Sequence, residues 1–181
     1  DSPNLNIAQA AGGSGSNNWL CNVNYETETN QVMCVANLQG HGSTDQGWYF
    51  CRGTVQGGTT NTTSWQTPAR LSPSANDPNQ GGSKGTYLNM GTVSGVKYIA
   101  WAYTPDWGNS TTNTNKGDGV VYLGEINTST GAVGWNSTPI VLDDSGGETQ
   151  NIGIAFDENA GKIVAVYNKG ESTSTDRDPH V

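Results

Sequence analysis

Apolar and polar residues alternate along residues 151–170, NIGIAFDENAGKIVAVYNKG, in two runs that a polar turn with one glycine separates. Alternation with a period of two is typical of a β-strand with one buried face, and two such runs around a short turn predict a hairpin. Residues 24–36 align with residues 155–167 without a gap, and residues 87–103 form a middle copy with a shorter turn. In the two longer copies, an aromatic residue and an acid precede a four-residue polar turn. The chain therefore contains a repeated hairpin.

A second hairpin pattern completes each repeat. Residues 48–55 parallel residues 119–126, and residues 65–71 parallel residues 135–142. Each predicted strand has about four to seven residues and is bounded by Gly, Asn, Asp or Ser. The repeating unit is therefore four strands in about 65 to 70 residues, and Trp and Pro mark the fourth strand.

This repeat predicts the fold class. Strands that follow one another through short turns pair antiparallel as a meander, and one such sheet cannot bury both of its faces alone. A β-sandwich also uses short strands, but it does not need the same turn and Trp-Pro signals at a fixed period. The sequence predicts an all-β fold of repeated four-stranded antiparallel blades, a β-propeller or a propeller-like array, with about two and a half to three units.

The repeat also sets the expected boundaries. Residues 1–18 are expected to be the end of a preceding blade (its fourth strand) and a linker, and residues 19–85 and 86–149 are blade units 1 and 2. Residues 150–181 are the first half of blade unit 3, so that the chain stops at Val181 in the loop before a third strand. Because closed propellers have about four blades or more, we expect a longer parent chain or closure with partner chains.

Aromatic and proline residues recur at fixed places in the unit. Pro68 and Pro139 lie 71 residues apart, and Tyr103 and Tyr167 lie 64 residues apart. Aromatic side chains in strands bury large apolar areas, so their recurrence favours packing between blades over ligand binding. The predicted blade-packing residues are Trp65, Pro68, Trp135, Pro139, Tyr25, Phe156, Tyr103 and Tyr167.

Composition restricts the partners. The chain has 181 residues with 25 Gly and 13% charged residues, and its six Trp and seven Tyr argue against disorder. The net charge is −8 and the eight basic residues form no cationic stripe, so nucleic acid is not an expected partner. No apolar run approaches the roughly 18 residues of a spanning helix, so membrane insertion is not expected.

The three cysteines are Cys21, Cys34 and Cys51. Their odd number, the lack of a Cys-x-x-Cys pair and the presence of only two His predict neither a full disulfide framework nor a zinc site. Two interpretations stay open, namely small buried apolar residues in strands or a Cys34–Cys51 bridge. No metal and no other cofactor is predicted.

Residues 154–167 resemble the repeats of large virion proteins of tailed phages, and so do residues 121–126 followed by residues 139–142. Blade units of this pattern occur in series in tail-fibre and other tail-associated proteins. The resemblance implies a structural component of the virion, an extracellular particle, whose partners are other virion subunits or further blades of the same parent chain. Rim loops would contact those subunits or host-surface glycans. The first unit departs from the pattern in its cysteines and in a long loop at residues 72–86.

Catalytic residues are not evident. The stretch Ser43 to Trp48, STDQGW, is one residue short of the Asp box of sialidase-type propellers, and it does not recur. The adjacent acids Asp157 and Glu158 begin the repeated turn, which favours a turn-forming role over acid–base catalysis. We therefore expect no enzyme activity, and a glycoside hydrolase is the least favoured function.

Binding through the long polar loops gives an alternative function. Trp107 with its neighbour Asp106, and His41 in another loop, are candidate contacts for a glycan or a partner subunit. An exposed aromatic ring can stack on a sugar, but it can equally cap the core or enter a subunit interface. The alternative is therefore a secreted or cell-surface, lectin-like β-propeller that binds carbohydrate through Trp107.

Overall fold

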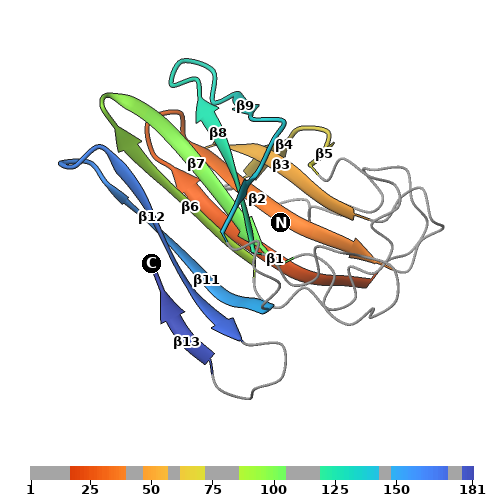
Figure 1. Ribbon diagram of the computed structural model, residues 1–181. Coiled ribbons are helices and arrows are strands. Elements are labelled where there is room, and N and C mark those ends of the chain that lie inside the picture. The colour runs from red at the N-terminus through yellow and green to blue at the C-terminus, as the bar shows by residue number, and fades with distance from the viewer. Residues whose placement is uncertain are drawn as a thin grey trace. The chain divides into compact units, whose positions relative to one another are not determined.

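The computed structural model describes residues 17–39, 47–56, 62–71, 86–104, 119–142, 148–170 and 177–181. In these ranges the chain forms thirteen β-strands and no helix, and the strands make three open antiparallel sheets (Figure 1). The all-β, antiparallel class that the sequence predicts is thereby confirmed for the described residues. The chain divides into two compact units, Asp1–Gln80 with one sheet and Gly81–Val181 with two sheets.

The first sheet is a meander in which each strand pairs with the next one along the chain. Its strands are β1 (Asn17–Glu26), β2 (Gln31–Gln39), β3 (Gly47–Gln56), β4 (Thr62–Trp65) and β5 (Ala69–Arg70). The order is β1-β2-β3-β4, and β5 also pairs with β3.

The second and third sheets lie in the second unit and repeat this topology. The second sheet contains β6 (Thr86–Val93), β7 (Val96–Tyr103), β8 (Val120–Ile126), β9 (Val133–Trp135) and β10 (Ile140–Val141). Its strands β6, β7 and β8 are consecutive neighbours, and both β9 and β10 pair with β8. The third sheet contains β11 (Glu148–Asp157), β12 (Lys162–Gly170) and β13 (Arg177–His180) in the order β11-β12-β13.

The fourth strand of the repeat is divided into two short pieces in both the first and the second sheet. Pro68 lies directly before β5, and Pro139 lies directly before β10. Proline has no N–H to donate to a strand ladder, so pairing with the third strand stops at each proline and resumes after it. One continuous fourth strand, as the sequence suggests, is therefore not formed.

In both split fourth strands, the first of the two pieces ends at a tryptophan that lies opposite a glycine of the third strand. Gly53 pairs with Trp65 in the first sheet, and Gly124 pairs with Trp135 in the second. A Cβ atom on Gly124 would lie 2.5 Å from Cγ1 of Val133 and 3.1 Å from Cε3 of Trp135. Glycine is thus required at this place because the neighbouring side chains occupy the space above its Cα atom.

Strands β1 and β11 carry the same irregularity. The pairing of β1 with β2 shifts by one residue between Asn18 and Cys21, and the pairing of β11 with β12 shifts between Gln150 and Gly153. One extra residue on the first strand of a pair is a β-bulge, which bends that strand and raises its local twist. The bulge is therefore a repeated feature of the fold.

The hairpin turns use residues with positive φ. Asn30 (φ 55°) and Gly161 (φ 65°) hold equivalent places in the β1–β2 and β11–β12 turns. The shorter β6–β7 turn has Ser94 (φ 50°) and Gly95 (φ 80°) as its two central residues. Positive φ at both central residues matches the right-handed twist of a two-residue hairpin, which accounts for the shorter middle copy.

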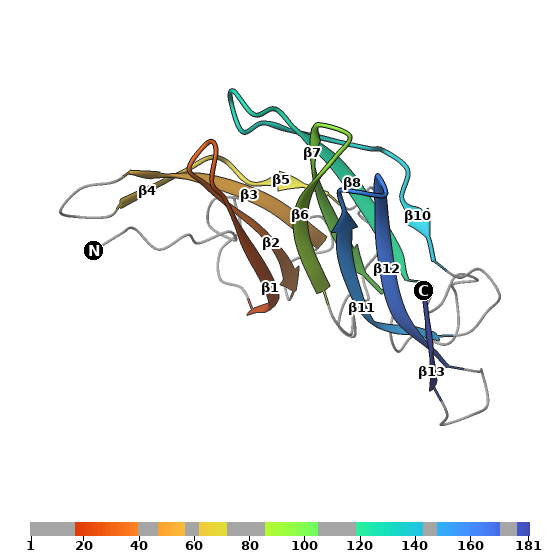
Figure 2. The same ribbon diagram turned by 90° about the vertical axis from the view of Figure 1, so that its left-hand side faces the viewer.

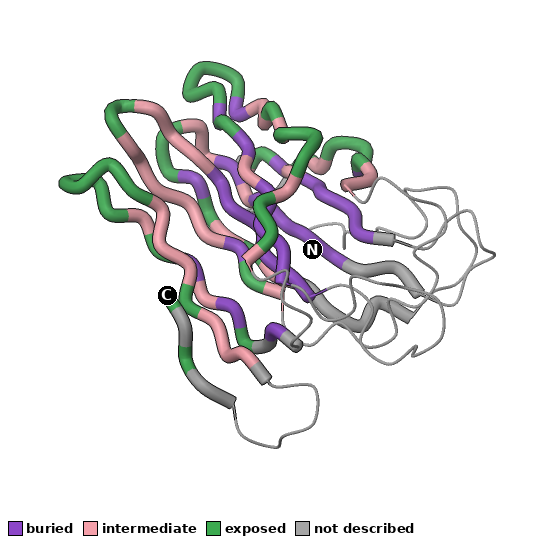
Figure 3. The backbone as a smooth tube through the Cα atoms, viewed as in Figure 1, coloured by how far each residue is buried: buried purple, intermediate pink, exposed green. Residues whose placement is uncertain are grey.

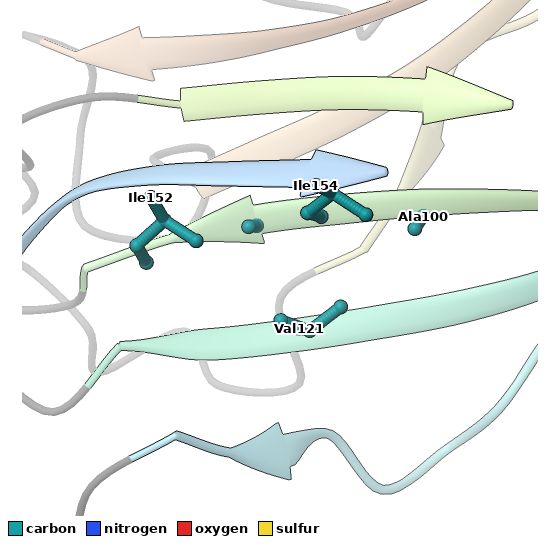
Figure 4. Close-up of a cluster of buried hydrophobic side chains, with 5 residues drawn as sticks. Ala100, Val121, Ile152 and Ile154 are labelled. Atoms are coloured by element: carbon teal, nitrogen blue, oxygen red, sulfur yellow. The ribbon is translucent and has the colours of Figure 1, made fainter. Parts of the chain in front are cut away.

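The described core of the second unit lies between its two sheets. It comprises Ala100, Ala102 and Val121 of the second sheet with Ile152 and Ile154 of the third (Figure 4). Strand β11 lies beside β6 and β7, as both ribbon views show (Figure 2). Each of these two sheets therefore covers one face of the other, as the meander topology requires.

An aromatic stack adds to the packing of the second sheet. The ring of Trp101 stacks on Tyr103, with 4.4 Å between centroids, and on Tyr122, with 5.3 Å between centroids. The indole N–H of Trp101 donates a hydrogen bond to Oγ1 of Thr86 at 2.9 Å. All three aromatic residues are buried, whereas the hairpin turns are exposed (Figure 3).

Several strands are longer than the sequence predicts. Strands β1, β3 and β11 each have ten residues, and β2 and β12 continue into polar segments that were expected to be loops. Backbone ladders need no apolar side chain, so polar residues extend the pairing at the strand ends.

Strand β13 corrects one expectation. The sequence placed the end of the chain in a loop, but Arg177–His180 pairs antiparallel with β12. These four residues show no apolar alternation, so period-two analysis could not identify them. Pro179 is tolerated because β13 is an edge strand among the described residues.

Candidate functional site

The three candidate glycan contacts lie outside the described residues. Trp107, Asp106 and His41 fall in the ranges 105–118 and 40–46, for which no geometry is described. Carbohydrate binding through Trp107 therefore remains a prediction from the sequence.

The acids at the repeated turns have structural partners. Oδ1 of Asp157 accepts the backbone N–H groups of Asn159 (3.1 Å) and Ala160 (2.9 Å). Oε1 of Glu158 accepts the backbone N–H of Thr92 on the second sheet at 3.3 Å. Carboxylate oxygens that hold turn N–H groups in this way stabilise the hairpin.

Glu26 holds the equivalent turn in the first sheet, but its side chain is buried. Its residue is 1% exposed, and its carboxylate accepts the backbone N–H groups of Glu28 (2.9 Å) and Thr29 (2.7 Å) and the hydroxyl of Thr29. A buried carboxylate is costly without such donors, so these bonds compensate for its loss of water. These hydrogen bonds account for the burial of an acid at the end of β1 by a structural role in the turn.

Clusters of metal-ligating side chains and membrane-spanning helices are both absent from the described part of the chain. No group of three or more His, Cys, Asp or Glu side chains is close enough there to hold a metal ion. Among the same residues, no helix is long and apolar enough to cross a membrane.

Cys34 and Cys51 are direct partners across the β2–β3 ladder, both are buried, and no disulfide joins them. Burial raises the pKa of the Cys51 thiol from 9.0 to about 11. The sulfur of Cys51 also lies 3.2 Å from the carbonyl oxygen of Gln66, to which the S–H donates. A protonated, buried thiol is a poor nucleophile, so Cys51 acts as a small apolar residue of the sheet.

One contact between the second and third sheets joins Phe156 of β11 to Gly91 of β6. A Cβ atom on Gly91 would lie 2.4 Å from both Cβ and Cγ of Phe156, so the ring occupies the space that the glycine leaves open. Beside it, Nδ2 of Asn89 donates to the carbonyl oxygen of Ile154 at 2.8 Å. The contact therefore combines an apolar centre with a hydrogen bond at its edge, which is the usual anatomy of a stable interface.

Apolar side chains are exposed on β1 and β12, and also on β6 (Tyr87) and β10 (Ile140 and Val141). Val23 (61%) and Tyr25 (46%) lie on β1, and Val166 (44%) lies on β12. Residues of this kind on one sheet face mark an interaction surface more often than isolated exposed residues do. Tyr25 was predicted to be a packing residue, whereas Val23, Val166 and Gly91 were not singled out from the sequence. The gap-free alignment shows that Val23 is equivalent to Ile154 and Val166 to Val35, but it does not show which of them are exposed.

The other predicted packing residues occupy the following places. Tyr103 is buried in the aromatic stack, and Phe156 and Tyr167 are half-buried against the core between the second and third sheets. The hydroxyl of Tyr167 donates to the carbonyl oxygen of Leu142 at 3.0 Å. The remaining ones are half-buried or buried in the split fourth strands: Trp65, Pro68, Trp135 and Pro139.

Comparison with known proteins does not place the chain in a family. No protein-family model matches the sequence, and no curated protein matches it. The relation to phage virion repeats therefore rests on the residue pattern alone.

Proposed function

We propose that this chain is a structural component of a phage virion, in the tail or tail-fibre region, and that its sheets are propeller-like blades. The observation that carries the proposal is recurrence at the level of geometry. The acid-capped turn and the split fourth strand each occur twice at equivalent places, and the bulge recurs within one residue of its equivalent place. The virion assignment rests on the resemblance of residues 154–167 to phage repeats.

The described chemistry favours a mechanical role. The acids that could have served as catalysts hold backbone N–H groups at the turns, as Asp157 and Glu26 do. The described sheets pair the backbone groups of their inner strands through antiparallel ladders, which makes them rigid elements. A serial array of such sheets would separate other subunits at a fixed distance and present loops on its rim.

Particle association tests the proposal. Virions are purified by density gradient from a lysed culture whose phage encodes the chain, and gradient fractions are digested and analysed by mass spectrometry. We expect peptides of this chain, such as the one that ends at Lys162, in the virion fraction at a constant ratio to capsid peptides. A host cytosolic enzyme serves as the control for contamination. Peptides found only in the soluble fractions would contradict the virion assignment.

The carbohydrate-binding alternative is separated by a glycan array. Saturable binding by the isolated chain that is lost in Trp107→Ala would favour the lectin-like function, whereas a structural role requires no such binding. A glycoside hydrolase would release reducing sugar from the bound glycans, which the same array material can report.

A further inference from the structure

Equivalent strands of the first and third sheets differ in which face is covered. Val23 on β1 is 61% exposed, whereas Ile154, at the equivalent place on β11, is 4% exposed. On the following strands the difference is reversed, because Val35 on β2 is 0% exposed and its equivalent Val166 on β12 is 44% exposed. The exposed apolar residues of β1 and of β12 thus lie on opposite faces of their sheets. In the first sheet this exposure is confined to β1, because Cys34 (5%) and Cys51 (1%), on the same face as Val23, are buried.

These faces can be defined by residues. The leading face carries Val23 and Tyr25 in the first sheet and Ile154 and Phe156 in the third. The trailing face is the opposite side, which carries Val35 in the first sheet and Val166 in the third. Direct cross-strand partners share a face and neighbours along a strand alternate, so the pairs Val23–Cys34 and Ile154–Ala165 fix this assignment.

The second unit shows what a leading face binds. The leading face of the third sheet packs on the trailing face of the second, where Ile154 contacts the cluster of Ala100 and Ala102. Phe156 fills the space above Gly91, and Asn89 on the same trailing face donates to the backbone of β11. Tyr103 and Tyr167 hold equivalent places in the repeat, so the residues that precede them can be matched one by one. Ala100 of the second sheet is then equivalent to Val164 of the third, and Ala102 is equivalent to Val166. The exposed Val166 therefore lies where the second sheet receives its neighbour.

We propose that two copies of this chain associate head to tail, with the leading face of the first sheet of one copy on the trailing face of the third sheet of the other. Val23 and Tyr25 would contact Val164 and Val166, as Ile154 and Phe156 contact the second sheet. The inference rests on the repeat in the proposed function and not on its virion assignment.

One difference between the two contacts is chemically matched. The place of Gly91, which pairs with Tyr98, is taken in the third sheet by Asp157, which pairs with Lys162. Phe156 enters an apolar gap at this position, whereas the tyrosine that replaces it on the leading face of the first sheet has a hydroxyl. The hydroxyl of Tyr25 donates its hydrogen to Oδ1 of Asn30, so its oxygen remains able to accept a hydrogen bond from the Lys162 ammonium, which an apolar ring could not do. The first leading face therefore suits the third trailing face.

The contact is heterologous, because each copy uses a different surface. Such contacts close into a ring when the rotation permits and otherwise extend into a filament. Both results leave no exposed apolar face in the middle of the assembly, which explains why Val23 and Val166 tolerate exposure in a single copy.

Complementation between two variants tests the proposal. The purified 181-residue chain is studied over a concentration series by light scattering after size exclusion and by native mass spectrometry. We expect wild type to associate beyond a monomer, and Val23→Lys and Val166→Lys each to weaken this about tenfold or more, because either removes one half of every contact. An equimolar mixture of the two variants retains one intact pair of faces, so it should form a heterodimer that does not grow.

The control is Thr128→Lys, which adds the same charge at an exposed turn outside both faces and should associate like wild type. Circular dichroism checks the folding of each variant, and Val23→Thr with Val166→Thr replaces a variant that does not fold. A wild-type chain that stays monomeric at every concentration overturns the proposal. So does a Val166→Lys chain that associates normally, or a mixture that stays monomeric. None of these results affects particle association, so a failure here is distinguishable from failure of the virion assignment.

Discussion

The contact between Phe156 and Gly91 allows a quantitative prediction for Gly91→Ala. In an extended strand, alanine is normally preferred over glycine by roughly 0.5–1 kcal/mol. Here the new Cβ atom would lie 2.4 Å from Cβ and Cγ of Phe156, far inside van der Waals contact. Both clashing atoms are near the backbone of β11, so the ring cannot simply rotate away. Overpacking of this kind costs about 1–3 kcal/mol, and we expect Gly91→Ala to reduce the free energy of unfolding by that amount.

The assay is urea unfolding followed by tryptophan fluorescence, with Phe156→Gly and the double variant to complete a cycle. Phe156→Gly removes both Cβ and Cγ, the two clashing atoms, so Gly91→Ala should cost less in the Phe156→Gly background, with a coupling energy of about 1 kcal/mol or more. The control is Gly153→Ala, because no atom lies closer than 4.0 Å to its added Cβ. A Gly91→Ala chain that is as stable as wild type, or an equal loss in both backgrounds, would refute the packing argument.

Three further variants test the turns, the split fourth strand and the buried thiol. Asp157→Ala removes the acceptor of two backbone N–H groups and should lower the free energy of unfolding by about 1 kcal/mol, measured by urea unfolding. Gly124→Ala should cost about 1–3 kcal/mol in the same assay, because the new methyl group meets Val133 at 2.5 Å. Folding raises the pKa of Cys51 from 9.0 to about 11, so the thiol of the unfolded chain ionises first as the pH rises. The free energy of unfolding should therefore fall by up to about 2 kcal/mol between these two pH values. This is measured as the difference between wild type and Cys51→Ala.

Each of these predictions has a matched comparison. Asp157→Asn keeps a side-chain oxygen and should lose less than Asp157→Ala, so an equal loss would contradict the capping role. For the second variant, Gly134→Ala adds a methyl group with no atom closer than 4.0 Å, and a similar cost at both sites would refute the steric reason. For the thiol, a stability difference that does not change with pH would show that Cys51 ionises equally in both states.

The sequence was informative where a local pattern has a local cause. The alternation in residues 151–170 predicted β11 and β12, and the acids before the turns do accept backbone N–H groups. The prediction was wrong for segments whose structure depends on backbone hydrogen bonding and that show no matching pattern of apolar residues. β13 has the sequence RDPH and pairs with β12 through the backbone ladder, and the proline in the fourth strand divides a segment whose apolar pattern looked continuous.

The contacts between sheets were the least accessible to sequence reasoning. Gly91 is a packing position only because Phe156, distant in sequence, lies over it, and no period in either strand encodes that meeting. Similarly, Val35 and Val166 hold equivalent places in the repeat, yet one is buried and the other is exposed. Exposure depends on which neighbour is present, which a single strand pattern does not contain. The repeat predicted that faces must be covered, but not which of them are.

The meander topology has a consequence for the order in which this chain folds. Among the described strands, no two paired residues lie further apart along the chain than Tyr98 and Glu125. Contacts of short sequence separation have a small loop-closure cost and form early. Each sheet can therefore assemble as soon as its own strands have left the ribosome, while its exposed apolar face waits for the next sheet to be synthesised. Slowed translation between two sheets would prolong the time for which that face is open to aggregation.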